Sequence, residues 1–145
     1  MIMNAAILAA LLPCASSEPN TFIPPSSKGG TRAALVWVQG AGIAAHLYTD
    51  LLTSIQNASV DLELWVGQPS FLLDTPEPLR LKANVEDTLA LMYKAGMPAD
   101  TPLLFGAHSL GTVFLQMLCP SAQFPSPSPA LHRSPNPVPT ALAAA

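Results

Sequence analysis

The stretch FGAHSLGT, residues 105–112, decides the fold class because it joins two apolar segments of different character. Residues 101–106 (TPLLFG) form a short apolar run that is typical of a strand. Residues 110–118 are apolar on nearly every side and end at Pro120, which is typical of a buried helix. The sequence therefore predicts a strand that turns directly into a helix, with Ser109 at the junction.

Two further strand-then-helix pairs precede this junction. Residues 33–38 (AALVWV) are continuously apolar, as in a parallel strand buried on both faces, and residues 44–57 carry leucines and an isoleucine at helical spacing. Residues 61–66 alternate apolar and polar, which indicates a strand nearer the sheet edge. Residues 79–95 are the clearest helix, with an apolar stripe of Leu81, Val85, Leu89 and Met92.

This alternation predicts an α/β fold. Three strands joined by helical crossovers form a parallel sheet with helices on both faces. We therefore expect a partial, doubly wound parallel sheet of three strands and three helices over residues 33–119. The preceding residues 18–32 lack periodicity and are expected to be a linker. Residues 120–145, rich in Pro, Ser and Ala, are expected to be a disordered tail.

Residues 1–17 resemble a signal peptide, with an apolar run from Ala5 to Leu12 followed by small residues. No Lys or Arg precedes the run, so secretion and a cytoplasmic location both stay open. No apolar run reaches the roughly 18 residues that a spanning helix needs.

Composition excludes several function classes. The net charge is −3 and the six Lys and Arg residues form no basic cluster, which argues against binding nucleic acid through its phosphates. Two cysteines, Cys14 and Cys119, provide neither a disulfide framework nor a metal site. We expect no cofactor and no metal.

The junction has the features of a nucleophile elbow. A sharp turn from strand to helix lifts a serine hydroxyl above the sheet, provided that small residues stand two before and two after it, here Ala107 and Gly111. The first free N–H of the helix, at Leu110, is placed to bind an oxyanion. A second donor should come from the Gly-rich loop after residues 33–38, where we assign Ala41, with Gly42 as the alternative.

The sequence His108-Ser109-Leu110-Gly111 after an apolar strand resembles the lipase and esterase members of the α/β-hydrolase superfamily. The upstream loop resembles their oxyanion loop, and the similarity covers residues 33–118. This chain departs from the family pattern at Ala107, where glycine is usual, and at Gln39, where histidine is usual. The resemblance implies hydrolysis of a carboxylic ester, from a lipid or a small acyl ester, through an acyl-serine intermediate at Ser109.

The acid and the base of the family's catalytic triad are missing. They follow the serine in that order in the family, but this chain has no Asp or Glu after Ser109, and its only later histidine is His132, within the Pro/Ser-rich segment. His108 should point away from the hydroxyl, and His46 is a surface residue or lies at the rim of the site. We therefore expect a truncated hydrolase with little or no turnover.

Three other interpretations stay open to different degrees. The half-domain can be a non-catalytic binding or regulatory module that recruits a partner or chaperone through an exposed sheet edge and an apolar helix. Ser109 can also stand in a tight turn without chemistry. A nucleotide-binding fold is disfavoured because Ala45 occupies the third glycine position of G-x-G-x-x-G and no GxxxxGK[ST] occurs.

Overall fold

A computed structural model describes residues 18–118 as an α/β structure around one open, mixed, four-stranded sheet. The sheet order is β1-β3-β2-β4, with β1 at Thr21–Ile23, β2 at Thr31–Val38, β3 at Leu62–Gln68 and β4 at Leu103–Ala107. Strands β2, β3 and β4 are parallel, whereas β1 pairs antiparallel with β3. The proposed signal peptide (1–17) and the Pro/Ser-rich segment (120–145) lie outside the described residues.

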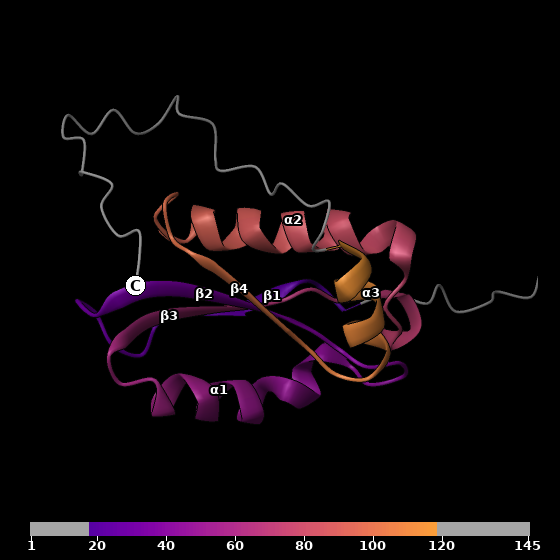
Figure 1. The fold of residues 1–145 in the computed structure, drawn as a ribbon, viewed down its shortest axis with the longest axis horizontal. Coiled ribbons are helices and arrows are strands. Elements are labelled where there is room, and N and C mark those ends of the chain that lie inside the picture. Colours follow the sequence, from indigo (N-terminus) through magenta and orange to yellow (C-terminus); the bar gives the residue numbers. More distant parts are fainter. Residues whose placement is uncertain (1–17, 119–145) are drawn as a thin grey trace, which may run out of the picture.

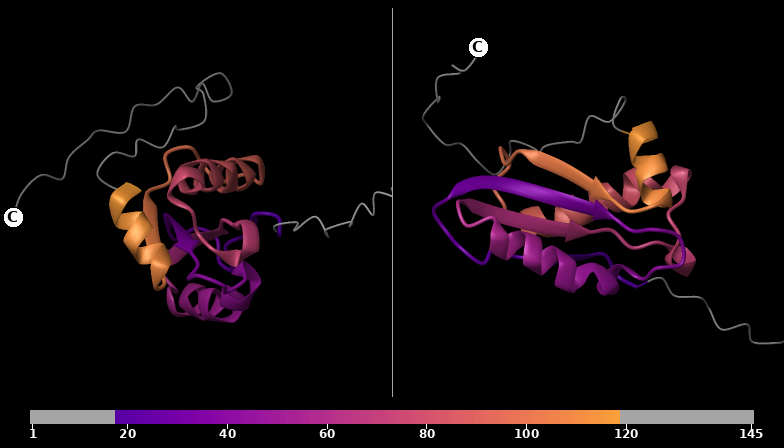
Figure 2. Two further views of the ribbon diagram at one scale, coloured as in Figure 1. Left: turned by 90° about the vertical axis from the view of Figure 1, so that its right-hand side faces the viewer. Right: turned by 60° about the horizontal axis from the view of Figure 1, so that its bottom comes forward.

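Helices cover both faces of this sheet, as the alternation predicts. The 3-10 turn η1 (Ala45–Tyr48) and helix α1 (Thr49–Ala58) lie on one face, and α2 (Pro78–Lys94) lies on the other (Figure 1). A second 3-10 turn, η2 (Leu72–Asp74), precedes α2, and α3 (Leu110–Leu118) follows β4. In the right-hand view of Figure 2, the arrowheads of the parallel strands point to the end of the sheet where α3 begins.

Two clusters of buried apolar residues hold the helices against the two faces of the sheet. The larger one joins the sheet to α2 and contains all four residues of the predicted α2 stripe, Leu81, Val85, Leu89 and Met92, each at most 2% exposed. The smaller one joins the sheet to α1 and contains Ala33, Tyr48, Leu52, Leu64 and Val66. Helix α2 ends at Lys94 and is followed, as expected, by Gly96, whose φ of 108° is readily adopted only by glycine.

The strand predictions differ from the structure in three respects. Part of the predicted linker 18–32 forms β1, and β2 begins at Thr31 instead of at residue 33. Strand β1 has three residues, too few to show periodicity, and it is held by packing, since Phe22 stacks on Trp65 with ring centroids 6.2 Å apart. Strand β3 is expected near the edge of the sheet, but it is buried from Leu64 to Gln68, and β1 pairs with its last three residues.

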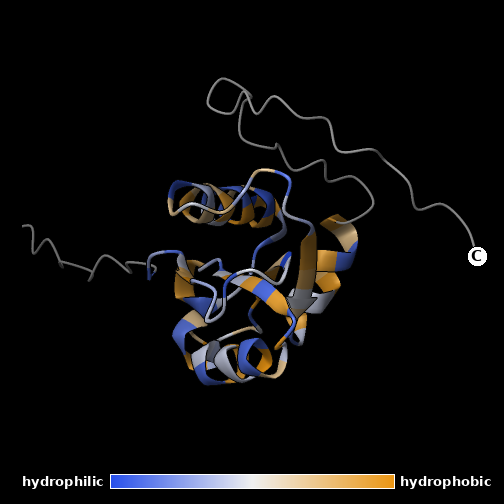
Figure 3. Ribbon diagram, turned by 90° about the vertical axis from the view of Figure 1, so that its left-hand side faces the viewer, coloured by the Kyte–Doolittle hydropathy of each residue, from blue (hydrophilic) through white to orange (hydrophobic). Residues whose placement is uncertain are grey.

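Helix α3 is not buried all round, although its sequence predicts this. Only Gly111 and Leu115 are buried, while Val113 is 53% and Met117 is 64% exposed. Its inner side packs on α2, β2 and β4, and within residues 18–118 β4 is an edge strand paired only with β2. Figure 3 shows hydrophobic residues along much of α3. Helix α3 therefore carries apolar side chains that no other part of residues 18–118 covers.

Candidate functional site

The turn between β4 and α3 is sharp and holds Ser109 in a strained backbone conformation. Ser109 has a φ of 51°, in the left-handed region that non-glycine residues rarely adopt. The turn is held by the His108 N–H, which donates to the Val38 oxygen at 3.1 Å, and by the Gly111 N–H, which donates to the His108 oxygen at 3.0 Å. Ser109 is exposed, so its hydroxyl is accessible to a ligand.

Gly111 permits the close approach of α3 to β2. An ideal Cβ at this position would overlap the main-chain oxygen of Gln39 and lie 2.8 Å from that of Val38. Two residues before the serine, Ala107 pairs in register with Val38, and its methyl group is accommodated there. The small residue after the serine is therefore a strict requirement, whereas alanine suffices before it.

The loop after β2, residues 39–42, lies against the elbow. A Cβ on Gly40 would lie 2.7 Å from Nδ1 of His108. The Gly40 N–H donates to Tyr48 Oη at 3.0 Å, and the Gly42 N–H donates to Thr75 Oγ1 at 3.1 Å. Between them, the Ala41 N–H has no hydrogen-bond partner among residues 18–118, and Ala41 is exposed.

The Leu110 N–H is the second unbonded donor at this site. Leu110 is the first residue of α3, and its N–H has no partner in the part of the chain that the structure describes. Unpaired N–H groups and the positive end of the helix dipole attract negative charge at such a position. The two donors chosen from sequence, on Ala41 and Leu110, are thus both unbonded, whereas the alternative donor on Gly42 is already engaged.

The sheet topology brings these two loops together. Strands β2 and β4 are neighbours, so their carboxyl ends meet at one edge of the sheet. From there β2 leads to α1 on one face, whereas β4 leads to α3, which packs against α2 on the other face (Figure 1). Ligands of open α/β sheets bind at such a point, where neighbouring connections diverge.

Neither described histidine contacts Ser109 Oγ. The His108 ring is turned toward Tyr48, with Nδ1 2.9 Å from Oη, and His46 Nδ1 lies 2.8 Å from Glu18 Oε1 in an exposed pair. His132 lies outside the described residues. Within residues 18–118 no side chain hydrogen-bonds to the serine hydroxyl and no base is in position to accept its proton.

Gln39 adds a feature that sequence reasoning did not anticipate. Its side chain is 1% exposed, and neither Oε1 nor Nε2 has a hydrogen-bond partner. An unpaired buried amide costs stability, on the order of 1–3 kcal/mol. In the sequence, Gln39 stands where the family pattern has histidine, and nothing around it indicates that it is buried.

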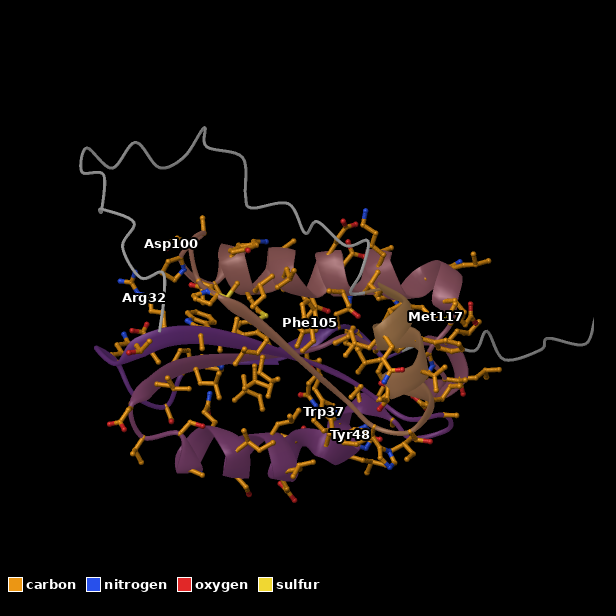
Figure 4. All side chains as sticks on the ribbon, in the orientation of Figure 1. Arg32, Trp37, Tyr48, Asp100, Phe105 and Met117 are labelled. Atoms are coloured by element: carbon orange, nitrogen blue, oxygen red, sulfur yellow. The ribbon has the colours of Figure 1, made fainter. Side chains whose placement is uncertain are left out.

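A separate hollow lies at the opposite end of the sheet. It has a volume of about 450 Å³ and is lined by Gly29, Gly30, Thr31, Arg32, Glu63, Asp100 and Pro102. Figure 4 places Arg32 and Asp100 at this end, away from Met117 of α3. Because it opens at the amino ends of β2 and β4, this hollow does not belong to the elbow.

The described residues hold neither a metal centre nor a membrane-spanning helix. Within 18–118 no three His, Cys, Asp or Glu side chains are grouped to hold a metal ion, and no helix there is long and apolar enough to cross a bilayer. In comparisons with known proteins, the chain matches no protein family, no curated protein and no solved structure.

Proposed function

We propose that this chain carries the nucleophile and the oxyanion-binding groups of an α/β-hydrolase-type serine hydrolase. The observation that supports this most is the combination of an exposed Ser109 in a left-handed turn with two unbonded N–H groups, on Leu110 and Ala41. A serine held this way meets the structural context of a nucleophile elbow. The substrate is a carboxylic ester of a lipid or a small acyl group.

The chemistry assigned to these groups is acyl transfer. Ser109 Oγ attacks the ester carbonyl, and the N–H groups of Leu110 and Ala41 donate to the oxyanion of the tetrahedral intermediate. The base that accepts the serine proton returns it to the leaving oxygen, so that the alcohol departs and leaves an acyl-serine, which water hydrolyses. Each step needs a base, and none of the described residues provides one. Residues 18–118 by themselves are therefore expected to have little or no turnover.

Chemical rescue tests this proposal. A fluorophosphonate probe should label the chain slowly, and added imidazole should accelerate labelling because it accepts the serine proton while fluoride leaves phosphorus. Ser109→Ala should abolish the accelerated labelling. Ser54→Ala, which removes an exposed serine hydroxyl from α1, is the matched control and should not change it. Labelling that imidazole does not increase would contradict the proposal.

The same labelling assay tests whether His132, in the Pro/Ser-rich segment, supplies the missing base. If fast labelling occurs without imidazole and is lost in His132→Ala as well as in Ser109→Ala, then His132 supplies the base. The proposed inactivity of this chain would then be wrong, although the assignment of Ser109 as the nucleophile would stand.

A second candidate function is that of a non-catalytic binding module, which the exposed apolar side of α3 and β4 favours. Leu104 is 50% exposed, in addition to Val113 and Met117, and large exposed apolar patches mark interaction sites. A pull-down that recovers one partner at a defined stoichiometry, and loses it in Val113→Lys/Met117→Lys but not in Ser109→Ala, would support this function. Recovery of chaperones alone would indicate an incompletely folded chain.

A further inference from the structure

The loop that presents the Ala41 N–H is anchored on both sides by side-chain hydroxyls. Tyr48 Oη accepts from the Gly40 N–H at 3.0 Å, and Thr75 Oγ1 accepts from the Gly42 N–H at 3.1 Å. These anchors come from different parts of the chain, Tyr48 from η1 and Thr75 from the end of η2. Together they bind the N–H groups of Gly40 and Gly42 and leave the Ala41 N–H between them without a partner among the described residues.

The Tyr48 anchor also joins the loop to the elbow. Its hydroxyl lies 2.9 Å from Nδ1 of His108, the residue before the nucleophile. A phenolic oxygen accepts and donates, so it can bind the Gly40 N–H and His108 together in either histidine tautomer. Tyr48 is 8% exposed and its ring packs 5.8 Å from that of Trp37, which fixes the hydroxyl in place (Figure 4).

The Thr75 anchor is oriented by its own turn. Its hydroxyl donates to the Leu73 oxygen at 3.0 Å, which leaves a lone pair for the Gly42 N–H. Leu73 and Asp74 have φ values of 54° and 52°, so this turn holds a backbone conformation that non-glycine residues rarely adopt. The cost of that turn is consistent with a defined task for the Thr75 hydroxyl.

We infer that Tyr48 and Thr75 are positioning residues of the oxyanion site, which hold residues 40–42 so that the Ala41 N–H is the donor for the substrate oxygen. This inference rests on the proposed function. Neither side chain contacts the reacting atoms. They act through the main chain of the loop. Tyr48 also links the loop to the elbow, because its hydroxyl contacts both Gly40 and His108.

The test measures imidazole-assisted phosphonylation of Ser109 in matched variants. Tyr48→Phe and Thr75→Val each remove one hydroxyl, and we expect each to lower the maximal labelling rate about 3- to 10-fold, which is the range of one neutral hydrogen bond. The probe concentration at half-maximal rate should change little, because the anchors do not contact the probe. Thr75→Ser, which keeps a hydroxyl, should restore the rate. Tyr93→Phe, the same chemical change on α2, is the control.

Amide hydrogen exchange measured by NMR gives the second readout. Exchange should accelerate at Gly40 in Tyr48→Phe and at Gly42 in Thr75→Val, while amides of the internal strand β3 keep the wild-type rate, which shows that the fold is intact. If wild-type Ser109 reacts but the anchor variants react equally fast, the inference is wrong and the proposed function stands. If wild-type Ser109 does not react with imidazole present, the proposed function is wrong and the inference falls with it.

Discussion

The main-chain oxygen of Gln39 occupies the space that a side chain on Gly111 would fill. This contact brings the first turn of α3 against the end of β2, and so places the N–H groups of Leu110 and Ala41 at one edge of the sheet. The contact joins two backbone segments, neither of which can move without disturbing the sheet or the elbow. The glycine therefore sets how closely α3 approaches β2 at the candidate site.

Gly111→Ala tests this contact by the sign of its effect on stability. Helix propensity alone predicts a gain of about 1 kcal/mol for alanine, whereas overlap with two main-chain oxygens predicts a loss of about 1–3 kcal/mol. We expect the overlap to dominate and the free energy of unfolding, measured in urea, to fall. Thr112→Ala, on the exposed neighbour, should change it by less than about 0.5 kcal/mol. A stabilised Gly111→Ala protein would show that α3 does not approach β2 this closely.

Ser109 should carry measurable backbone strain. A left-handed conformation costs an L-residue about 1–2 kcal/mol relative to glycine. Ser109→Gly and Ser109→Ala both remove the hydroxyl, but only glycine relieves the strain. We expect the glycine variant to unfold with a free energy about 1 kcal/mol higher than the alanine variant. Equal stabilities would mean that Ser109 is not held at its φ of 51°.

Gln39→Met should stabilise the fold. Methionine has a similar volume and removes two buried polar atoms that have no partner, so we expect a gain of about 1 kcal/mol. Gln39→Glu should do the opposite, because it buries a carboxylate without a counter-charge. Thermal unfolding of the two variants against wild type measures both effects. A destabilised Gln39→Met protein would indicate that the amide does have a partner in solution.

The exposed side of α3 should promote association. Val113→Lys/Met117→Lys places charge on the apolar surface, and we expect weaker light scattering and less binding of a hydrophobic dye, with little change in unfolding temperature. Leu79→Lys, at a leucine of α2 that is 96% exposed, is the control because it lies on a different helix. Equal improvement by the control would mean that α3 is not the associating surface.

Much of the fold follows from periodicity in the sequence. The α2 stripe and its glycine cap are confirmed, because four buried residues at helical spacing leave a strong signal. Strand β1 was missed because three residues show no period and their pairing with β3 is a long-range contact. The burial of β3 was underestimated for the same reason, since its last three residues pair with β1. The exposure of α3 was missed because a sequence shows apolar residues without showing what covers them.

The candidate site was only partly accessible from sequence. The elbow, Leu110 and the Ala41 loop are local in the chain and follow from residue type and order, although their role in catalysis stays a prediction. Tyr48 and Thr75 could not be found this way. Their hydroxyls reach Gly40 and Gly42 through tertiary structure, and a tyrosine or threonine at these positions has no distinctive pattern around it.

The central claim is that the Leu110 and Ala41 N–H groups bind the oxyanion formed at Ser109, and a crystal structure of the phosphonylated chain tests it most directly. After reaction in the presence of imidazole, the phosphonyl oxygen should accept hydrogen bonds from both N–H groups at about 2.7–3.1 Å, the range of oxyanion-hole donors. A phosphonyl oxygen that points into solvent, or that contacts neither group, would contradict the account.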